Sequence, residues 1–187
     1  MHLVVHAPTV GGPIQNFEVD ADRQAGGILR LAYQLDADLS QLRLPMSRTP
    51  ARANNLWRHT CFEAFIATAG SPGYAELNFS PSGQWAAYTF TGRRTGMRTP
   101  PLEAAPPAAW QRTDGRLELH VEIRLDGLLS APPGSALRLA LSAVIEEESG
   151  TISYWALRHP EQQPDFHHPG GFVLELPGQE PANQKGA

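Results

Sequence analysis

Two short stretches of the chain place reactive or hydrogen-bonding side chains at every second position. The first carries His59, Cys61 and Glu63, and the second carries Glu76 and Asn78. An imidazole, a thiol, two carboxyl groups and an amide can bind a polar ligand, transfer protons or ligate a metal. Side chains two residues apart share one face of a β-strand. These groups therefore act together only if both stretches are strands that pair in the right register.

The segment around these residues predicts three antiparallel strands. They are expected at Trp57–Ala67, Tyr74–Ser80 and Gln84–Thr91, where apolar and polar residues alternate. The sequence Pro81-Ser82-Gly83 suits a three-residue hairpin loop, because proline presets φ and glycine takes the left-handed position. The strands are therefore expected to form a meander that carries the reactive groups.

The hydrophobic pattern sets the register of the first two strands, since a slip of one residue would move every apolar side chain into water. The side chains expected to face the core together are those of Phe62, Ala64, Ile66, Leu77 and Phe79. The opposite face then carries Glu63 opposite Asn78, with Glu76 as a diagonal neighbour. A three-residue loop adds Tyr88 to this face and sends Trp85 into the core, whereas a two-residue loop would place Trp85 on the polar face.

We interpret this polar face as a binding site for a small ligand, closed by the histidine-rich segment His159–His168. The alternative is ordinary solvated surface, which most outward-facing sandwich positions form. The face mixes aromatic and hydrogen-bonding groups and has no lysine, which favours a site. The expected ligand-binding residues are Trp57, His59, Glu63, Glu76, Asn78, Tyr88, Arg94, His159 and His167. No catalytic residue and no metal ligand is expected among them.

The remainder of the chain predicts an all-β, antiparallel β-sandwich with little helix. Further strands are expected at Leu29–Leu35, Leu117–Leu125, Leu137–Ile145 and Phe172–Leu176, and loops at Thr49–Asn55, Pro100–Ala109 and Glu161–Gly171. Seventeen glycines and seventeen prolines separate these segments. We expect one domain over residues 1–178 and a flexible polar tail over residues 179–187.

Composition narrows the classes of function. The 187 residues are 41% hydrophobic and 18% charged, with a net charge of −4 and no basic cluster beyond Arg93-Arg94, so we expect no nucleic-acid partner. No run approaches the roughly 18 apolar residues of a membrane span. The first residues lack the pattern of a signal peptide, and the single cysteine cannot form an internal disulfide. We therefore expect a cytoplasmic location.

Several motifs resemble the bacterial DOMON-like proteins. They are Leu56–Phe65 (LWRHTCFEAF), Glu76–Trp85 (ELNFSPSGQW), Arg93–Met97, Ser153–Leu157 and Pro164–Pro169, within a resemblance that runs from about Leu29 to Leu176. The resemblance implies a β-sandwich related to family 9 carbohydrate-binding modules and to haem-binding cytochrome domains. Members of this wider group hold sugars or haem and are mostly not enzymes. Where the sugar-binding modules often carry acidic residues, this chain has Arg58-His59, so their calcium chemistry is not implied.

A sugar-like ligand is the first hypothesis, because aromatic rings stack on sugar faces while carboxyl, amide and guanidinium groups bind hydroxyls. Trp57, Tyr88 and Trp155 could supply the rings, although the apolar surroundings of Trp155 favour the core. Haem is the alternative cofactor, with Met97 facing one of the histidines His59, His159 or His168. No other cofactor is expected.

Three further alternatives remain open. A metal could bind His159, Asp165, His167 and His168, but four ligands at recognisable spacing are absent, and adjacent histidines on an extended chain point to opposite sides. Hydrolysis could use Glu63 and Glu76 as a retaining carboxyl pair, or Cys61 with His59. A protein-interaction role is the third. Any protein partner is unknown from the sequence.

Overall fold

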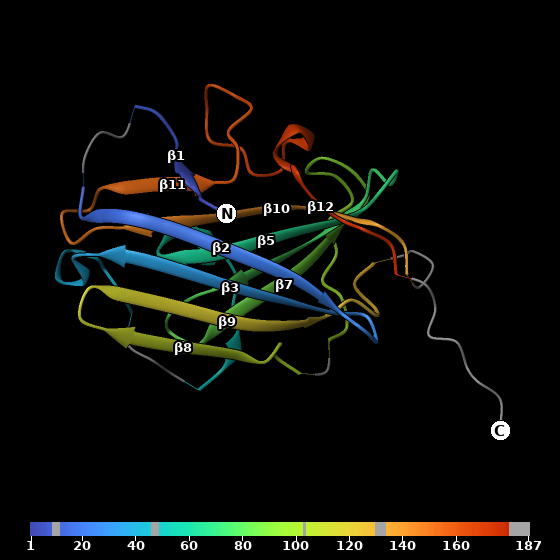
Figure 1. Ribbon diagram of the computed structural model, residues 1–187, viewed down its shortest axis with the longest axis horizontal. Helices are drawn as coiled ribbons and strands as arrows, with labels where there is room; N and C mark the ends of the chain where they lie inside the picture. Colours follow the sequence, from blue (N-terminus) through green and yellow to red (C-terminus); the bar gives the residue numbers. More distant parts are fainter. Residues whose placement is uncertain (9–11, 46–48, 103, 130–133, 180–187) are drawn as a thin grey trace.

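The structure is a computed structural model that describes the whole chain except residues 9–11, 46–48, 103, 130–133 and 180–187. Two β-sheets pack face to face (Figure 1). Sheet A has the strand order β2 (Ile14–Gln24), β3 (Ile28–Ala37), β9 (Arg116–Arg124) and β8 (Ala108–Thr113). Sheet B has the order β1 (Val4–Val5), β11 (Ile152–Ala156), β10 (Leu137–Glu146), β5 (Cys61–Thr68), β6 (Tyr74–Phe79), β7 (Gln84–Phe90) and β4 (Ala51–Arg52), with β12 (Leu174–Leu176) also paired to β10.

The predicted all-β sandwich is thus confirmed. Neighbouring strands are antiparallel apart from the short parallel pair of β4 and β7. Helical structure in the described residues consists of three short 3-10 turns: η1 (Leu39–Gln41), η2 (Leu56–Arg58) and η3 (Pro169–Gly171). Within the same residues, no helix has the length and apolarity needed to cross a membrane.

The core between the sheets comes from one parity of each strand. Sheet A contributes side chains such as Leu29, Leu31, Tyr33 and Leu35 of β3, none more than 2% exposed. Sheet B contributes the side chains predicted to face the core, including Phe62, Leu77 and Trp85. Burying apolar surface on both inner faces is the main stabilising contribution to such a sandwich.

Three ring contacts and one hydrogen bond of the core lie directly beneath the candidate site. The ring of Phe62 makes edge contacts with those of Phe17, Tyr33 and Trp110 at centroid distances of 5.1–5.4 Å. The hydroxyl of Tyr33 crosses between the sheets and donates to the carbonyl oxygen of Glu63 at 2.7 Å. This buried hydrogen bond fixes the backbone of β5 against sheet A at the residue that matters most for the site.

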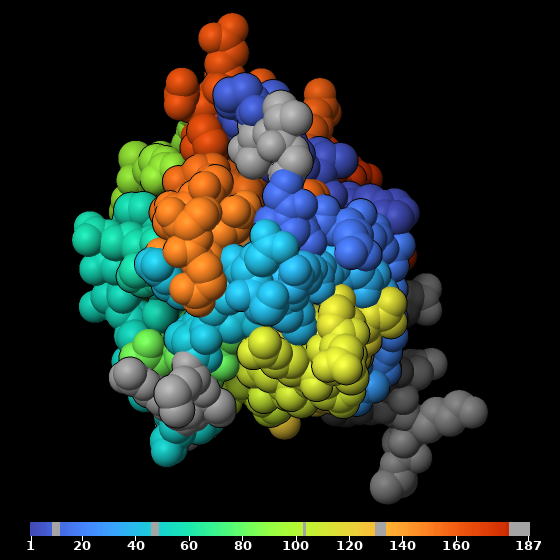
Figure 2. All heavy atoms as spheres, turned by 90° about the vertical axis from the view of Figure 1, so that its left-hand side faces the viewer, coloured from blue at the N-terminus to red at the C-terminus, as the bar shows by residue number. Residues whose placement is uncertain are grey.

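One end of the sandwich is closed by turns rather than by strands. Figure 2 looks onto this end, where the segment around η1 (cyan) lies between the turn that follows β10 (orange) and the turn between β8 and β9 (yellow). Backbone hydrogen bonds join Glu148 to Gln41 and Ala37 to Gly115. Leu39 is 5% exposed and completes the core there.

Some sequence-based boundaries were wrong, and one long strand was missed. The strand expected from Trp57 begins at Cys61, because Asn55 has a φ of 60° and the chain makes the turn η2 before it becomes extended. The expected loop Pro100–Ala109 runs into β8, an edge strand whose exposed residues do not alternate. The strand expected from Phe172 begins at Leu174 because η3 precedes it. The strand β2 was not predicted, since a register shift between Ile14 and Asn16 breaks its pattern.

The predicted tail, residues 179–187, lies outside the described residues except for Gln179. The side chain of Gln179 donates to the carbonyl oxygen of Arg23 at 2.9 Å.

Candidate functional site

The outer face of sheet B carries the polar side chains in the predicted register. Glu63 lies opposite Asn78, and Glu76 lies opposite Phe65 and Tyr88. The loop between β6 and β7 has the predicted three residues: Ser80 and Gln84 are joined by a backbone hydrogen bond of 2.9 Å, and Gly83 has a φ of 85°. Trp85 therefore faces the core and Tyr88 faces outward, as expected.

A row of three polar side chains crosses this face. Ser142 of β10 pairs with Glu63 of β5, which pairs with Asn78 of β6. We call these three residues the polar row. Their exposed fractions are only 1%, 3% and 1%. A solvated sheet face would leave such side chains in water, so the surface alternative does not describe this face.

The polar row has hydrogen-bonding capacity that the surrounding protein does not use. Ser142 Oγ, Glu63 Oε1 and Asn78 Oδ1 are all buried and have no hydrogen-bond partner among the residues that the structure describes. A buried polar atom left in this condition costs about 1–3 kcal/mol. Three of them in one cross-strand row make this face a place where further hydrogen bonds would be favourable.

Burial changes the ionisation of the two carboxyl groups. Desolvation and the neighbouring Glu76 raise the pKa of Glu63 well above its ordinary value of 4.5, against a smaller opposing effect of Arg94. Desolvation also raises the pKa of Glu76, although the hydrogen bond from Asn78 Nδ2 at 2.7 Å and the charge of Arg94 lower it in part. Both groups therefore hold a proton more readily than a glutamate in water does.

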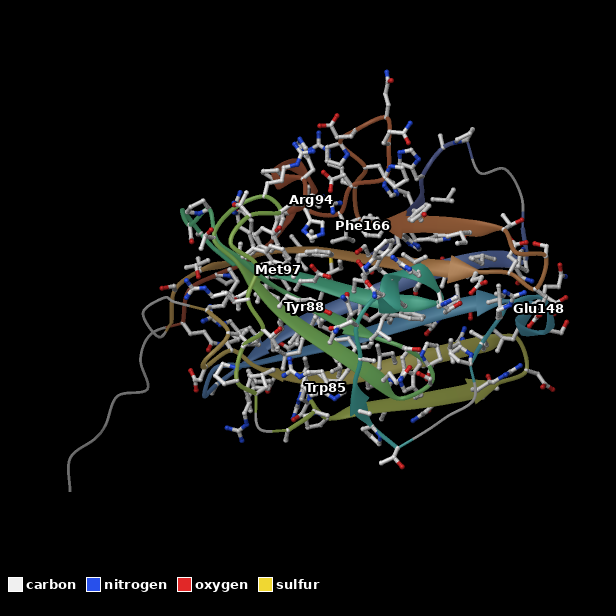
Figure 3. The ribbon with its side chains drawn as sticks, turned by 180° about the vertical axis from the view of Figure 1, so that it is seen from behind. Trp85, Tyr88, Arg94, Met97, Glu148 and Phe166 are labelled. Carbon is white, nitrogen blue, oxygen red and sulfur yellow. The ribbon has the colours of Figure 1, made fainter. Side chains whose placement is uncertain are left out.

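One end of the outer face is covered by the segment that contains η2. Leu56 packs against Cys61 and Ala86, and the ring of Tyr88 lies against the same cluster. The hydroxyl of Tyr88 donates to Asn54 Oδ1 at 2.8 Å. Figure 3 looks onto this face and shows Tyr88 near its middle, with Arg94 and Phe166 above it in the view.

The other end is covered by the segment 157–172, as the sequence predicted for the histidine-rich loop. Phe166 and Phe172 pack against Phe65 and Tyr74. His167 makes an edge contact with Phe65 at 5.1 Å. The polar row thus lies between two apolar clusters that exclude water from its sides.

A hydrogen-bonded chain joins Arg94, Tyr74 and His167 of this loop beside Glu76. The backbone N–H of Arg94 donates to the Tyr74 hydroxyl at 3.2 Å, and that hydroxyl lies 2.7 Å from His167 Nδ1. Desolvation and the charge of Arg94 lower the pKa of His167 to about 4. The imidazole is therefore neutral at pH 7. In the tautomer in which Tyr74 donates to Nδ1, the ring proton lies on Nε2, the atom that is 3.8 Å from Glu76 Oε2.

Asp165 holds the covering loop in place. Its two carboxylate oxygens accept hydrogen bonds from Arg93 and Arg94 at 2.6–3.0 Å, and the backbone N–H of His167 donates to the same carboxylate. Burial alone would raise the pKa of Asp165, but the hydrogen bonds from Arg93 and Arg94 outweigh it and lower the pKa below 3.8. This clamp is present at neutral pH and is lost only as the pH falls below 3.8 through the lowered pKa.

We expect Asp165→Ala to release the covering loop without unfolding the sandwich. Backbone amides of residues 166–172 should exchange with solvent at least about tenfold faster, while global stability falls by less than about 1 kcal/mol. Hydrogen exchange followed by mass spectrometry measures both. The control is Glu161→Ala, which removes a carboxylate that lies 3.6 Å from Arg93 on the same loop but is 46% exposed. Equal exchange rates in the two variants would contradict the clamp.

Three of the predicted ligand-binding residues lie away from the polar row. Trp57 lies on η2, not on the strand, and is 49% exposed. The Cζ atom of Arg58 lies over its ring, 5.4 Å from the ring centroid. His59 lies beyond Cys61, where its Nδ1 is 2.7 Å from Glu146 Oε2. His159 bonds the carbonyl oxygen of Val4 at 2.9 Å. The structure brings together the other six: Glu63, Glu76, Asn78, Tyr88, Arg94 and His167.

His59 instead lines a separate pocket of about 480 Å³ at the end of the outer face. Arg43, Leu56, Ser80 and Gln84 line it as well. Burial raises the pKa of Cys61 well above its ordinary value, and the ring of His59 bonds Glu146 instead of turning to this thiol. The geometry therefore gives no support to the predicted cysteine–histidine pair.

Two residues of the site were missed. Ser142 has the outward parity in β10, but nothing in the sequence shows that β10 pairs with β5. Asp165 was considered only as a metal ligand, and its role as the partner of two arginines depends on contacts 71 and 72 residues apart in the chain. Trp155 packs against the core, as its apolar surroundings indicated.

The cofactor alternatives gain no support from the geometry. Met97, the predicted haem ligand, is 62% exposed, and haem binding stays a prediction. Among the described residues, no group of three or more His, Cys, Asp or Glu side chains could hold a metal ion. His168 Nδ1 accepts a hydrogen bond from Gly170, and its Nε2 lies 3.2 Å from Glu161, so it points away from His167 as expected.

Comparisons with known proteins support the fold but do not identify a ligand. No family model matches the chain, and no curated protein matches it. Among solved structures, the chain is similar to a candidate carbohydrate-binding protein from Bacteroides uniformis, with a TM-score of 0.60 over 84% of this chain and 76% of that chain. The two sequences are 14% identical. At that identity the similarity shows a shared β-sandwich fold and nothing more specific.

Proposed function

We propose that this chain is a binding module that holds a small sugar-like molecule on the outer face of sheet B. The observation that carries the proposal is the polar row, where three buried polar atoms on adjacent strands lack partners among the described residues. The fold shared with a candidate carbohydrate-binding protein and the motifs that resemble DOMON-like proteins support it.

A sugar suits the chemistry around the polar row. Its hydroxyl groups both donate and accept hydrogen bonds, so they match a hydroxyl, a carboxyl and an amide oxygen in one line. Its C–H groups suit the aromatic rings on either side, such as those of Tyr88 and Phe166. Binding would also supply the missing hydrogen bonds, which stabilises the complex.

The same geometry favours binding over hydrolysis. A retaining glycosidase needs one carboxylic acid and one ionised carboxylate, so the environment must separate the two pKa values in opposite directions. Here burial raises the pKa of both Glu63 and Glu76. The environment therefore does not favour, in either residue, the ionised form that a nucleophile needs.

We expect Ser142→Ala to raise the free energy of unfolding by about 1 kcal/mol, because it removes a buried hydroxyl whose hydrogen bond is unmade. The same variant should bind a sugar ligand at least about fivefold more weakly. The control is Ser153→Ala on the neighbouring strand β11. Ser153 is also buried, at 2% exposed, but its Oγ accepts a hydrogen bond from Trp155 Nε1 at 2.9 Å.

Ser153→Ala should therefore lose about 1 kcal/mol of stability, the opposite sign. Urea denaturation compares the stability of the two variants. Calorimetric titration with a sugar that binds the wild type gives the affinity of each. If Ser142→Ala loses as much stability as Ser153→Ala, Ser142 has a structural role and the polar row is not a ligand site.

The proposal itself is tested by a thermal-shift screen of the purified protein against neutral sugars, amino sugars and sugar phosphates. A ligand at 100 times its Kd stabilises the fold by about 2.7 kcal/mol. Any hit is repeated with Asn78→Ala and with Glu118→Gln, a half-buried carboxyl on the outer face of sheet A. We expect the shift to disappear in Asn78→Ala and to persist in Glu118→Gln. A thermal shift that persists in Asn78→Ala would place the ligand elsewhere. If no sugar raises the melting temperature, the proposal is contradicted.

A further inference from the structure

The polar row presents mainly acceptors. The amide of Asn78 uses its donor end, since Nδ2 donates to Glu76 Oε1 at 2.7 Å, which leaves the acceptor Oδ1. Glu63 Oε1 is an acceptor whenever the carboxyl is ionised, and Ser142 Oγ offers two lone pairs beside its single proton. A ligand that satisfies this row must therefore bring more donors than acceptors.

The charges around the row favour a positive group. Glu63 and Glu76 lie on the same face, and the charge of Glu76 raises the pKa of Glu63. Arg94 acts on both, but its Nη2 donates to Asp165 at 2.8 Å and its side chain is 59% exposed. His167 is neutral at pH 7 because its pKa is about 4. An anionic group on a ligand would meet two carboxyl groups here.

We propose that the ligand of the polar row carries a positively charged amino group, which lies against Glu63 and Asn78. This inference rests on the proposed function and names the class of its ligand, an amino sugar or a molecule with the same ammonium and hydroxyl groups. An ammonium has three donors and no acceptor, which matches the three atoms of the row. A neutral sugar brings more acceptors than donors, since each hydroxyl has two lone pairs and one proton, and it places no positive charge beside Glu63.

A metal ion would supply the same charge. The described residues hold no group of three or more His, Cys, Asp or Glu that could ligate one, whereas one carboxylate, one amide oxygen and one hydroxyl suffice for an ammonium. The geometry therefore favours the amine.

Ionisation of Glu63 links binding to protons. Burial and the charge of Glu76 raise the pKa of Glu63, and an ammonium beside the carboxyl would lower that pKa again. Any proton that the carboxyl holds in the free protein is therefore released to the buffer on binding. The titratable or charged groups that surround Glu63 are Cys61 on β5, Tyr74 and Glu76 on β6, Tyr88 on β7, Tyr33 from sheet A, Arg94 after β7, and Asp165 and His167 in the covering loop. Burial raises the pKa of Cys61, Tyr33, Tyr74 and Tyr88 above ordinary values that already exceed 7. These four groups therefore stay neutral at the pH 7 of the test.

The test is calorimetric titration of the intact protein with glucosamine, N-acetylglucosamine, glucose and calcium chloride at pH 7, in two buffers of different ionisation enthalpy. We expect glucosamine to bind at least about tenfold more tightly than the two neutral sugars. The heat should depend on the buffer in the way that proton release requires. In Glu63→Gln the preference should fall below about threefold, while Glu118→Gln keeps it.

Two results with the sugars would overturn the amino-group inference and leave the proposed function standing. They are equal or tighter binding of glucose or N-acetylglucosamine, and glucosamine binding whose preference survives in Glu63→Gln. Binding of calcium without any preference for glucosamine overturns it as well. If none of the three sugars binds, both the inference and the proposed function fail.

Discussion

Glu63→Met should make the protein more stable than the wild type, by about 1–3 kcal/mol at pH 7, and should abolish sugar binding. Glu63 is 3% exposed, and its Oε1 lacks a hydrogen-bond partner in the part of the chain that the structure describes. Methionine has an unbranched chain of similar length, so it fills the space without a polar atom. Residues that bind ligands commonly reduce the stability of the free protein, and their replacement then raises it.

The stability gain of Glu63→Met should also depend on pH. An acid whose pKa is raised on folding keeps a proton that the unfolded chain releases, so the wild type loses stability as the pH rises from 4.5 towards the folded-state pKa. The variant lacks this loss. Its advantage should therefore be smallest below pH 4.5 and grow above it, with a slope of at most about 1.4 kcal/mol per pH unit.

Urea denaturation at several pH values measures this advantage directly. Glu118→Gln serves as the control, because its carboxyl lies on the other sheet and is partly exposed. A Glu63→Met variant that is less stable than the wild type at pH 7 would show that the Glu63 carboxyl supports the fold. The polar row would then be a structural network, not a ligand site.

Phe62→Ala should cost about 3–5 kcal/mol, the largest loss of stability that we expect from a single side chain here. Phe62 is fully buried at the centre of the core, and its ring touches Phe17, Tyr33 and Trp110. The cavity left by the ring cannot close, because strands of both sheets hold its neighbours in place. A loss this large approaches the whole stability of many domains.

The midpoint of urea denaturation gives the size of this effect. Trp57→Ala is the control, since Trp57 is another large aromatic side chain but is 49% exposed, and it should change stability by less than about 0.5 kcal/mol. If Phe62→Ala costs less than about 1 kcal/mol, Phe62 is not the centre of the core and the register of β5 described here is wrong.

Pattern alone was sufficient to predict the register that builds the site. Placing Phe62 in the core requires Glu63 to face outward, and the hairpin loop of Pro81-Ser82-Gly83 then places Tyr88 on the same face as Glu76. Both steps depend on neighbouring segments and on the two-residue period of strands, which a sequence displays directly. The fold class follows from the same alternation.

Pattern could not identify residues whose position depends on distant segments. Ser142 joins Glu63 through the pairing of β10 with β5, about 80 residues away along the chain, and no local signal sets that pairing. Trp57 and His59 were assigned to the site by extending the alternation of β5 four residues too far. The turn at η2, with its left-handed Asn55, ends that alternation. Cover of the polar row by the segment that contains η2 was likewise a tertiary effect, whereas closure by His159–His168 was predicted.

The ligand's location is the central claim, and amide chemical-shift mapping of the labelled protein tests it most directly. The sugar with the largest thermal shift is titrated into the protein while the backbone resonances are followed. A competing location exists on sheet A, where Asp20, Arg30 and His120 line a groove of about 680 Å³. We predict that the shifts concentrate at Glu63, Asn78 and Ser142 and their strand neighbours. Shifts confined to the groove of sheet A would contradict the assignment of the site to the outer face of sheet B.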